Sequence, residues 1–263
     1  MPDLTVTLMQ SDLAWEDVAA NIGRFDAAID RLEAAGDLIV LPEMFSTGFS
    51  MNAARLAEPM TGQAVTWLRR KAQARGAVLT GSVMIEEGGK YFNRLVLARP
   101  DGTLATYDKR HLFRYAGEEK VYTPGHGHIT VECRGWRIRP FICYDLRFPL
   151  WTRNLDLAYD AALFVANWPD RRSAHWRALL VARAIENQCY VIAVNRVGRD
   201  GNGLGYDGGS MVISPTGEIL MEGLFEAATP TVTLRHDLLE QYRKDFPAWM
   251  DADTDLMRRP ETR

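Results

Sequence analysis

The chain has 263 residues, of which 47% are hydrophobic and 25% charged, and its formal net charge is −3. This balance is typical of a globular protein with a sizeable core, and it argues against a basic nucleic-acid surface or a polybasic membrane patch. No signal-length apolar run follows Met1, and no segment approaches the apolar length that spans a bilayer. We therefore expect a cytoplasmic protein without nucleic-acid or membrane partners.

The first half of the chain combines strands with two amphipathic helices. Val18, Ile22, Phe25 and Ile29 recur at steps of four and three, the spacing of a helix with one core-facing stripe. The segment 86–89 contains two glycines and gives a hairpin signal between two strands. We expect strands over residues 4–9, 37–41, 77–85, 91–98 and 103–107, and helices over residues 18–32 and 61–75.

The second half repeats this alternation. Leu150, Trp151, Leu155 and Leu157 have helical spacing and follow an apolar strand. We expect strands over residues 129–132, 136–142, 161–166, 190–197, 209–214, 218–221 and 231–234, and helices over residues 150–157, 174–187 and 238–243. Many strands are joined by hairpins rather than by helices, which argues against a barrel. The order predicts an α/β protein, a four-layer α-β-β-α sandwich of two similar half-units that form a single domain over residues 1–263.

Three chemically demanding residues stand directly after predicted strands. Glu43 follows a wholly apolar strand, Lys109 follows another, and Cys143 stands where the apolar run 141–142 stops. Strand ends are where layered α/β folds build their sites. A helix start after Cys143 would favour a negative sulfur and would place the N–H of Tyr144 near an oxyanion. The alternative is that Cys143 is a buried hydrophobe and Glu43 a solvated loop residue.

The histidines and glycines point to no metal or nucleotide site. None of His111, His126, His128, His175 and His236 is placed at the end of a buried strand, so a cysteine–histidine pair is not expected. The His126-Gly127-His128 segment with Cys133 matches no common zinc spacing, so we expect no metal. The G-x-G-x-x-G pattern at residues 203–208 precedes a strand rather than a helix, which excludes a dinucleotide site.

A carboxylate can replace histidine as the base for a thiol. A glutamate can take the thiol proton and later protonate a leaving amine, and a lysine ammonium can neutralise an oxyanion. Glu43 and Lys109 are therefore the natural partners of Cys143. The three cysteines of the chain, which are odd in number and without paired spacing, are expected to be reduced thiols; they are Cys133, Cys143 and Cys189.

The segments around these residues resemble the signature segments of the nitrilase (carbon–nitrogen hydrolase) superfamily. They are Leu-Pro-Glu at 41–43, Tyr-Asp-Lys-Arg-His-Leu-Phe at 107–113 and Ile-Cys-Tyr-Asp-Leu-Arg-Phe-Pro at 142–149. The resemblance runs in order over nearly the whole chain. The segment 108–114 is most similar to the omega-amidase branch, in particular its bacterial members.

The resemblance implies a Glu–Lys–Cys triad, which falls on Glu43, Lys109 and Cys143. It also implies a second glutamate six residues before the proline of a Pro-Gly turn, which is Glu118 if Pro124 is that proline, although Glu119 is adjacent. The α-β-β-α fold, pairing of subunits into a homodimer or a larger homo-oligomer and the absence of a cofactor follow from the same resemblance.

An omega-amidase substrate carries a 2-oxo-carboxylate remote from its amide, so the pocket needs a second cation. Arg114 is the first candidate and Arg171 the second, because arginine suits planar carboxylates. Phe113, Tyr115 and Trp168 are expected to wall the pocket. Arg147 is expected to form a structural ion pair with Asp145.

Other functions remain open at this stage. The chain could be another amide or N-carbamoyl hydrolase of the superfamily, such as an amidase for deaminated glutathione or a carbamoylase, or a nitrilase. A different class is a non-catalytic binding protein on the same fold. The presence of Glu43, Lys109 and Cys143 argues against that class.

Overall fold

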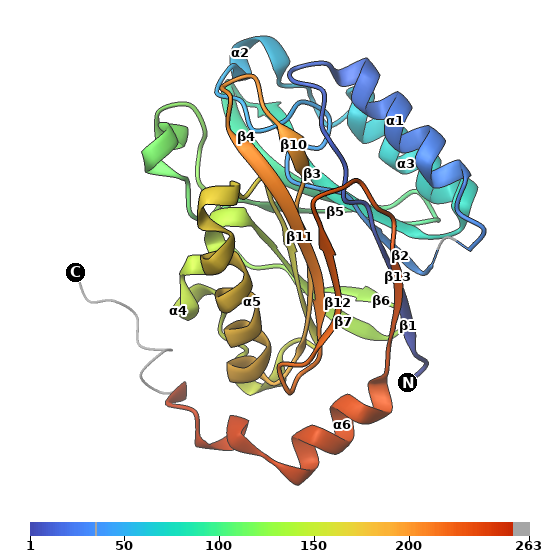
Figure 1. Ribbon diagram of the computed structural model, residues 1–263, viewed down its shortest axis with the longest axis vertical. Helices are drawn as coiled ribbons and strands as arrows, with labels where there is room; N and C mark the ends of the chain where they lie inside the picture. The colour runs from blue at the N-terminus through green and yellow to red at the C-terminus, as the bar shows by residue number, and fades with distance from the viewer. Residues whose placement is uncertain (35, 255–263) are drawn as a thin grey trace.

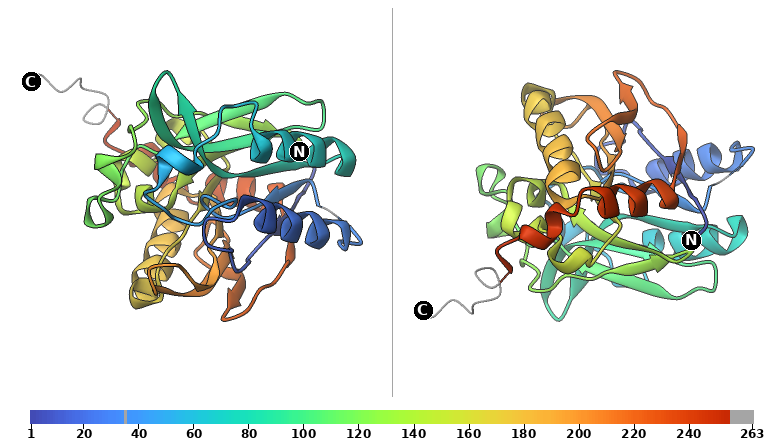
Figure 2. Two further views of the ribbon diagram at one scale, coloured as in Figure 1. Left: turned by 90° about the horizontal axis from the view of Figure 1, so that it is seen from above. Right: turned by 90° about the horizontal axis from the view of Figure 1, so that it is seen from below.

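The structure is a computed structural model that describes residues 1–34 and 36–254 (Figure 1). Two β-sheets pack face to face, with helices on the outside of each (Figures 1 and 2). This is the predicted four-layer α-β-β-α arrangement, with the hairpins that favoured it over a barrel. In the described part of the chain, none of the helices has the length and apolarity needed to cross a membrane.

The first sheet has the strand order β13-β1-β2-β3-β4-β5. Its strands are β1 (Leu4–Leu8), β2 (Leu38–Val40), β3 (Val78–Glu87), β4 (Lys90–Ala98), β5 (Leu104–Asp108) and β13 (Thr231–Leu234). Strands β1, β2 and β3 are parallel, and the remaining pairings are antiparallel. Two long helices, α1 (Val18–Asp30) and α3 (Gln63–Arg75), lie on its outer face, and the short α2 (Ala53–Leu56) precedes α3.

The second sheet has the order β10-β11-β9-β8-β7-β6, with β12 paired to β11. Its strands are β6 (Val131–Cys133), β7 (Trp136–Ile142), β8 (Ala161–Val165), β9 (Tyr190–Val194), β10 (Val197–Arg199), β11 (Gly205–Ile213) and β12 (Ile219–Leu224). Strands β7, β8 and β9 are parallel, as β1, β2 and β3 are in the first sheet. The helices of this half are α4 (Pro149–Thr152), α5 (Ser173–Asn187) and α6 (His236–Asp245).

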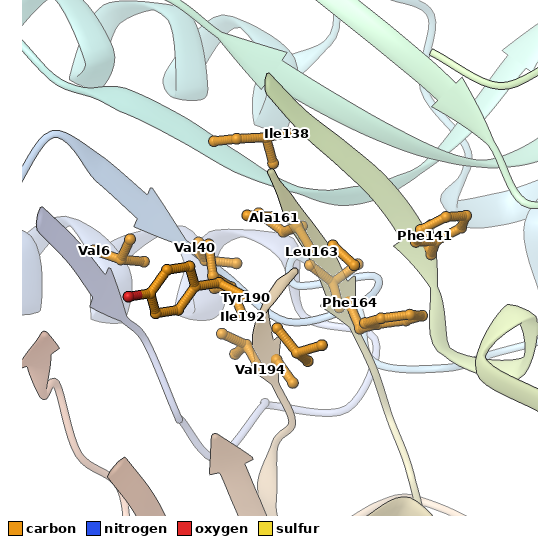
Figure 3. Close-up of a cluster of buried hydrophobic side chains, with 14 of the residues drawn as sticks. Val6, Val40, Ile138, Phe141, Ala161, Leu163, Phe164, Tyr190, Ile192 and Val194 are labelled. Carbon is orange, nitrogen blue, oxygen red and sulfur yellow. The ribbon is translucent and has the colours of Figure 1, made fainter. Parts of the chain in front are cut away.

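Strand β2 shows why apolar runs form the central strands. Leu38 and Val40 point into the core between the sheets, whereas Ile39 points to the cluster under α1 and α3. A strand that is buried on both faces needs apolar residues at every position. Figure 3 shows Val6 and Val40 of the first sheet beside Tyr190 and Ile192 of the second. This packing holds the ends of β2 and β7 at fixed positions.

Local signals explain several element boundaries. The N-cap Asp17 accepts a hydrogen bond of 2.9 Å from the main-chain N–H of Ala20 and so begins α1. Helix α3 ends at Gly76, which has the left-handed conformation that glycine adopts without strain. Gly88 and Gly89, both with positive φ, form the predicted turn between β3 and β4.

The predicted helix over residues 150–157 is wrong. Helix α4 ends at Thr152, the next residue Arg153 is extended, and only a 3₁₀ turn (Leu155–Leu157) follows. The physical reason is Asn154, whose side chain donates to the main-chain oxygens of Tyr159 and Asn187 and holds the segment in a non-helical path. The predicted strand 190–197 is likewise interrupted after Val194.

Candidate active site

The predicted strand-end residues meet between the two sheets. Glu43 follows β2, Lys109 follows β5 and Cys143 follows β7, so both sheets contribute. Their side chains are almost completely inaccessible: 0% of Glu43, 1% of Lys109 and 9% of Cys143 is exposed. Lys109 Nζ lies 2.8 Å from Glu43 Oε1. The buried strands therefore bring an acid, a cation and a thiol into one desolvated site.

Glu118 is the second carboxylate on the lysine. Lys109 Nζ lies 3.0 Å from its Oε1 and 2.9 Å from its Oε2, and the N–H of Phe113 donates to Oε2 at 2.6 Å. Glu118 is fully buried at the start of the 3₁₀ helix η2 (Glu118–Lys120). Within the described residues, Glu119 is half-buried and forms no hydrogen bond or ion pair with Lys109. Of the two glutamates considered from the sequence, the geometry places Glu118 beside the lysine.

The charges in this cluster follow from burial and proximity. Burial works against the charged form of Lys109, but Glu118 and Glu43 hold the pKa of its ammonium well above the ordinary value. Burial raises the pKa of Glu118 in spite of the opposing effect of Lys109. Burial, followed by the negative charge of Glu43, also raises the pKa of the Cys143 thiol. These directions favour the ammonium form of Lys109 and the thiol form of Cys143.

The helix expected to favour a negative sulfur at Cys143 is short in the structure. Cys143 begins only a five-residue 3₁₀ helix, η3 (Cys143–Arg147), and α4 after it has four residues. The sulfur therefore needs a base. Cys143 has a φ of 44°, a backbone conformation that is strained for residues other than glycine. The chain therefore turns abruptly at Cys143, directly after β7. Tyr144 follows in η3, and its N–H as an oxyanion donor stays a prediction.

Two asparagines complete the cluster and were missed in the sequence. Asn167 donates its main-chain N–H to Glu43 Oε2 at 2.8 Å and its Nδ2 to the Glu43 carbonyl at 2.5 Å. It follows β8, so the strand-end rule that selected Glu43 could have found it. Asn93 lies within β4, and its Nδ2 donates to Glu43 Oε1 and to Glu118 Oε1. No sequence signal distinguishes it from any other strand asparagine.

A cavity of about 590 Å³ opens onto the cluster. Phe113, Tyr115, Trp168 and Arg171 line it, as predicted from the sequence. Lys109, Cys143, Tyr144 and Asn167 reach it from the cluster side. The G-x-G-x-x-G segment contributes to its wall through Leu204 and Tyr206, which belong to the hairpin of β10 and β11 rather than to a nucleotide loop.

Of the two arginines predicted for the cavity, Arg171 lines it and Arg114 does not. Arg114 is exposed and does not line the cavity, because it stands in the turn η1 (Arg114–Ala116) between the two aromatic residues that do. Arg147 and Arg172 line it instead. Their guanidinium groups lie over aromatic rings, Arg147 at 4.8 Å from Trp168 and Arg172 at 5.3 Å from Phe113.

The expected ion pair between Arg147 and Asp145 is also absent from the described residues. Asp145 is saturated by donors from Tyr107, His111 and Ile142. Arg147 is therefore free to face the cavity, where its Nη2 lies 3.2 Å from His175 Nδ1.

The histidines lie outside the triad, as expected. His111 binds Asp145 and stacks on Phe148, and the ring of His128 packs at a tilt against that of Trp151. Within residues 1–34 and 36–254, no group of three or more histidine, cysteine, aspartate or glutamate side chains could hold a metal ion.

Comparison with known proteins agrees with this geometry. Residues 5–244 match the family described as carbon–nitrogen hydrolase. The sequence is 50% identical to the omega-amidase YafV of Escherichia coli K12, over 96% of this chain and 98% of that protein. It is 32% identical to a 2-oxoglutaramate amidase of Bacillus subtilis, over 96% of this chain and 98% of that protein. The structure is also similar to the crystal structure of XC1258 from Xanthomonas campestris, with a TM-score of 0.94 and 45% sequence identity. That protein is a CN-hydrolase superfamily protein with an arsenic adduct in its active site, and the match covers 96% of this chain and 98% of that chain.

Proposed function

The chain belongs to the carbon–nitrogen hydrolase family and is a hydrolase of carbon–nitrogen bonds other than peptide bonds, and from this premise we propose that it is an omega-amidase. Its substrate would be the terminal carboxamide of a small 2-oxo acid, for example 2-oxoglutaramate, which yields 2-oxoglutarate and ammonia. The observation that carries the proposal is the buried Glu43–Lys109–Glu118 cluster beside Cys143 at a cavity lined by arginines. The omega-amidase and 2-oxoglutaramate amidase relatives support the choice of amide.

In the proposed mechanism, Glu43 first takes the proton of Cys143. Burial raises the pKa of this thiol, so the proton has to leave as the sulfur attacks the carboxamide carbon. The oxyanion that forms is stabilised by the Lys109 ammonium and by the Tyr144 N–H. Glu118 keeps Lys109 in place through its two contacts with Nζ.

The tetrahedral intermediate then collapses. Glu43 gives its proton to the departing nitrogen, the carbon–nitrogen bond breaks, and ammonia leaves a thioester on Cys143. Glu43 next takes a proton from water, whose oxygen attacks the thioester carbon. The carbon–sulfur bond breaks and the thiol is regenerated with its proton. Asn167 orients Glu43 throughout, because its two donors hold both the carboxylate and the carbonyl of that residue.

The substrate carboxylate would bind at the arginine side of the cavity. Arg147, Arg171 and Arg172 line it, and in the described part of the chain none of them forms an ion pair with a carboxylate. A guanidinium that faces a cavity without an anionic partner is suited to a ligand carboxylate. Arg147 is the first choice, because it belongs to the same 3₁₀ helix as Cys143 and is thus fixed relative to the sulfur.

The experiment that tests this function is ammonia release from a panel of amides. The panel contains 2-oxoglutaramate, 2-oxosuccinamate, glutamine, asparagine, an N-carbamoyl amino acid and a nitrile. We expect the highest kcat/KM on the 2-oxo acid amides. A preference for the N-carbamoyl amino acid or for the nitrile would contradict the proposal.

We also propose that two subunits pair through the helices of the second half. Leu150 on α4 is 78% exposed and Ile185 on α5 is 48% exposed, and Arg153 Nη1, just after α4, donates to the carbonyl of Glu186 in α5. Exposed large apolar side chains on neighbouring helices favour a subunit interface. Light scattering should give the mass of a dimer or a larger assembly, and Leu150→Glu should lower it. A monomeric wild-type protein would contradict this arrangement.

A further inference from the structure

We propose that Asn93 is a positioning residue that allows Glu43 and Glu118 to share one lysine while both remain carboxylates. Asn93 is 1% exposed in β4, and its main-chain carbonyl accepts a 3.0 Å hydrogen bond from the N–H of Lys109. The same residue thus touches all three ionisable members of the cluster, one through its backbone and two through its side chain. This inference rests on the proposed roles of Glu43 and Glu118.

The two carboxylates are joined by two donors. Asn93 Nδ2 lies 2.8 Å from Glu43 Oε1 and 3.3 Å from Glu118 Oε1. Lys109 Nζ lies 2.8 Å and 3.0 Å from the same two oxygens. An amide nitrogen carries two hydrogens, so Asn93 can serve each carboxylate with one of them.

The orientation of the amide indicates a functional rather than a packing role. Asn93 Oδ1 is buried and has no hydrogen-bond partner within the described residues. Turning the amide over would place this oxygen against two carboxylate oxygens, so only the observed orientation is compatible with them. A buried acceptor without a donor is costly, and native proteins retain few of them. In the part of the chain that the structure describes, the oxygen of the Asn93 amide stays without a donor, and both of its N–H groups point to the carboxylates.

The charges of the cluster explain why a second donor is needed. Two carboxylates and one ammonium leave a net negative charge among side chains that are almost fully buried, and such a group of charges tends to take up a proton. In the described part of the chain, Cys143 from η3 and Tyr122 after η2 also interact electrostatically with the two carboxylates, and burial raises the pKa of both, which favours their neutral forms. The main-chain donors of Phe113 and Asn167 each reach one carboxylate only. Asn93 is the neutral donor that reaches both.

A proton on either carboxylate of the cluster, Glu43 or Glu118, would stop the reaction. A proton on Glu43 removes the base for Cys143, and a proton on Glu118 weakens the anchor of Lys109. Burial already raises the pKa of Glu118, so loss of one donor should bring proton uptake closer to neutral pH. We therefore expect Asn93 to extend the activity to lower pH as well as to hold the two carboxylates in position.

The test is the pH profile of kcat/KM for Asn93→Ala and Asn93→Asp on 2-oxoglutaramate. We expect the acid limb of the alanine variant to move to higher pH by about one unit, with at least tenfold lower activity at neutral pH and partial recovery in alkali. The aspartate variant keeps the volume of Asn93 and adds a third carboxyl group, so it should lose more activity and shift further. If Asn93→Ala does not fold, the position of the acid limb in Asn93→Asp, which keeps the side-chain volume, still tests the inference.

Asn195→Ala is the matched control. Asn195 is a buried amide between β9 and β10 that donates to the carbonyls of Trp168 and Gly208, and within residues 1–34 and 36–254 it forms no hydrogen bond with a carboxylate. It should lower stability without moving the acid limb. Acid limbs of both Asn93 variants that overlay the wild-type limb would overturn the inference. Glu43→Gln measured in the same buffers separates this result from failure of the proposed function, since that variant should be inactive at every pH.

Discussion

Asp145 accepts two hydrogen bonds from His111 on a single oxygen, one from the main-chain N–H at 2.9 Å and one from Nδ1 at 2.8 Å. Its other oxygen accepts from the hydroxyl of Tyr107 at 2.7 Å and from the N–H of Ile142 at 3.0 Å. Tyr107 and His111 flank Lys109 in the sequence, and Ile142 precedes Cys143. One buried carboxylate thus connects the lysine segment of the first sheet with the cysteine elbow of the second.

Asp145→Asn should weaken this connection. An amide offers one acceptor and one donor in place of two acceptors, so one of the two sets of hydrogen bonds is lost. We expect the free energy of unfolding to fall by about 2 kcal/mol and kcat to fall on the order of tenfold. Chemical denaturation and steady-state kinetics measure the two effects. Asp101→Asn, at an exposed turn, is the control. Wild-type kcat in the Asp145 variant would exclude the positioning role.

The roles proposed for the triad predict severe losses. Glu43→Gln removes the base and Cys143→Ser replaces the nucleophile by a weaker one, so each should lower kcat by a factor on the order of a hundred or more. Ammonia release gives the rates. Cys133→Ala, a buried thiol at the end of β6, should retain activity. Near wild-type turnover by either triad variant on every active amide would refute the mechanism.

Arg147→Ala should affect substrates selectively. Loss of a charge-assisted hydrogen bond to the substrate carboxylate should raise KM for 2-oxo acid amides about tenfold or more, with little change for simple aliphatic amides. Arg114→Ala is the natural control, because Arg114 is exposed outside the cavity lining. Equal effects of Arg147→Ala on both kinds of amide would remove it from carboxylate binding.

A substoichiometric thiol reagent should label Cys143 before the other two cysteines. Burial raises the pKa of all three thiols, but Cys143 lines the cavity, where a reagent can reach it, and has Glu43 to take its proton. Peptide mass spectrometry over a time course gives the order. Glu43→Gln should slow labelling of Cys143 only. Simultaneous labelling of all three would indicate an unactivated thiol.

The C-terminal helix should be secured by an acid-sensitive ion pair. Asp160 Oδ1 lies 2.7 Å from Arg137 Nη2 and 2.8 Å from Arg243 Nη1 of α6. Burial alone would raise the pKa of Asp160, but the hydrogen bonds from Arg137 and Arg243 bring it below the ordinary value. Such a group stabilises the fold above its unfolded pKa, and the contribution is lost as the pH falls through the folded pKa.

Asp160→Asn should therefore lower the free energy of unfolding at neutral pH by roughly 3 kcal/mol, because it leaves buried Arg243 without its anion. The difference from wild type should shrink as the pH falls below about 4. Urea denaturation across this range checks both statements. Asp237→Asn, exposed at the start of α6, should show no comparable loss. A difference that stays constant down to acid pH would contradict the ion-pair explanation.

The sequence by itself determined the layers and the positions of the catalytic candidates. Apolar runs such as Leu38 to Val40 and the periodic residues of α1 are local patterns, and burial on one or two faces follows from them directly. Because layered α/β folds build their sites at strand ends, Glu43, Lys109 and Cys143 could be named as candidates before their distances were known. The order of these residues in recognisable segments then gave the family, which the match over residues 5–244 confirms.

The tertiary structure decided what depends on contacts between distant segments. The turn at Arg114 has no repeating geometry, so only packing determines that Phe113 and Tyr115 line the cavity and Arg114 does not. Arg147 faces the cavity because Asp145 is saturated by Tyr107 of β5 and His111 of the loop after it. The raised pKa of the Cys143 thiol and the bridge formed by Asn93 likewise arise from burial and from charges brought together only when the two sheets pack.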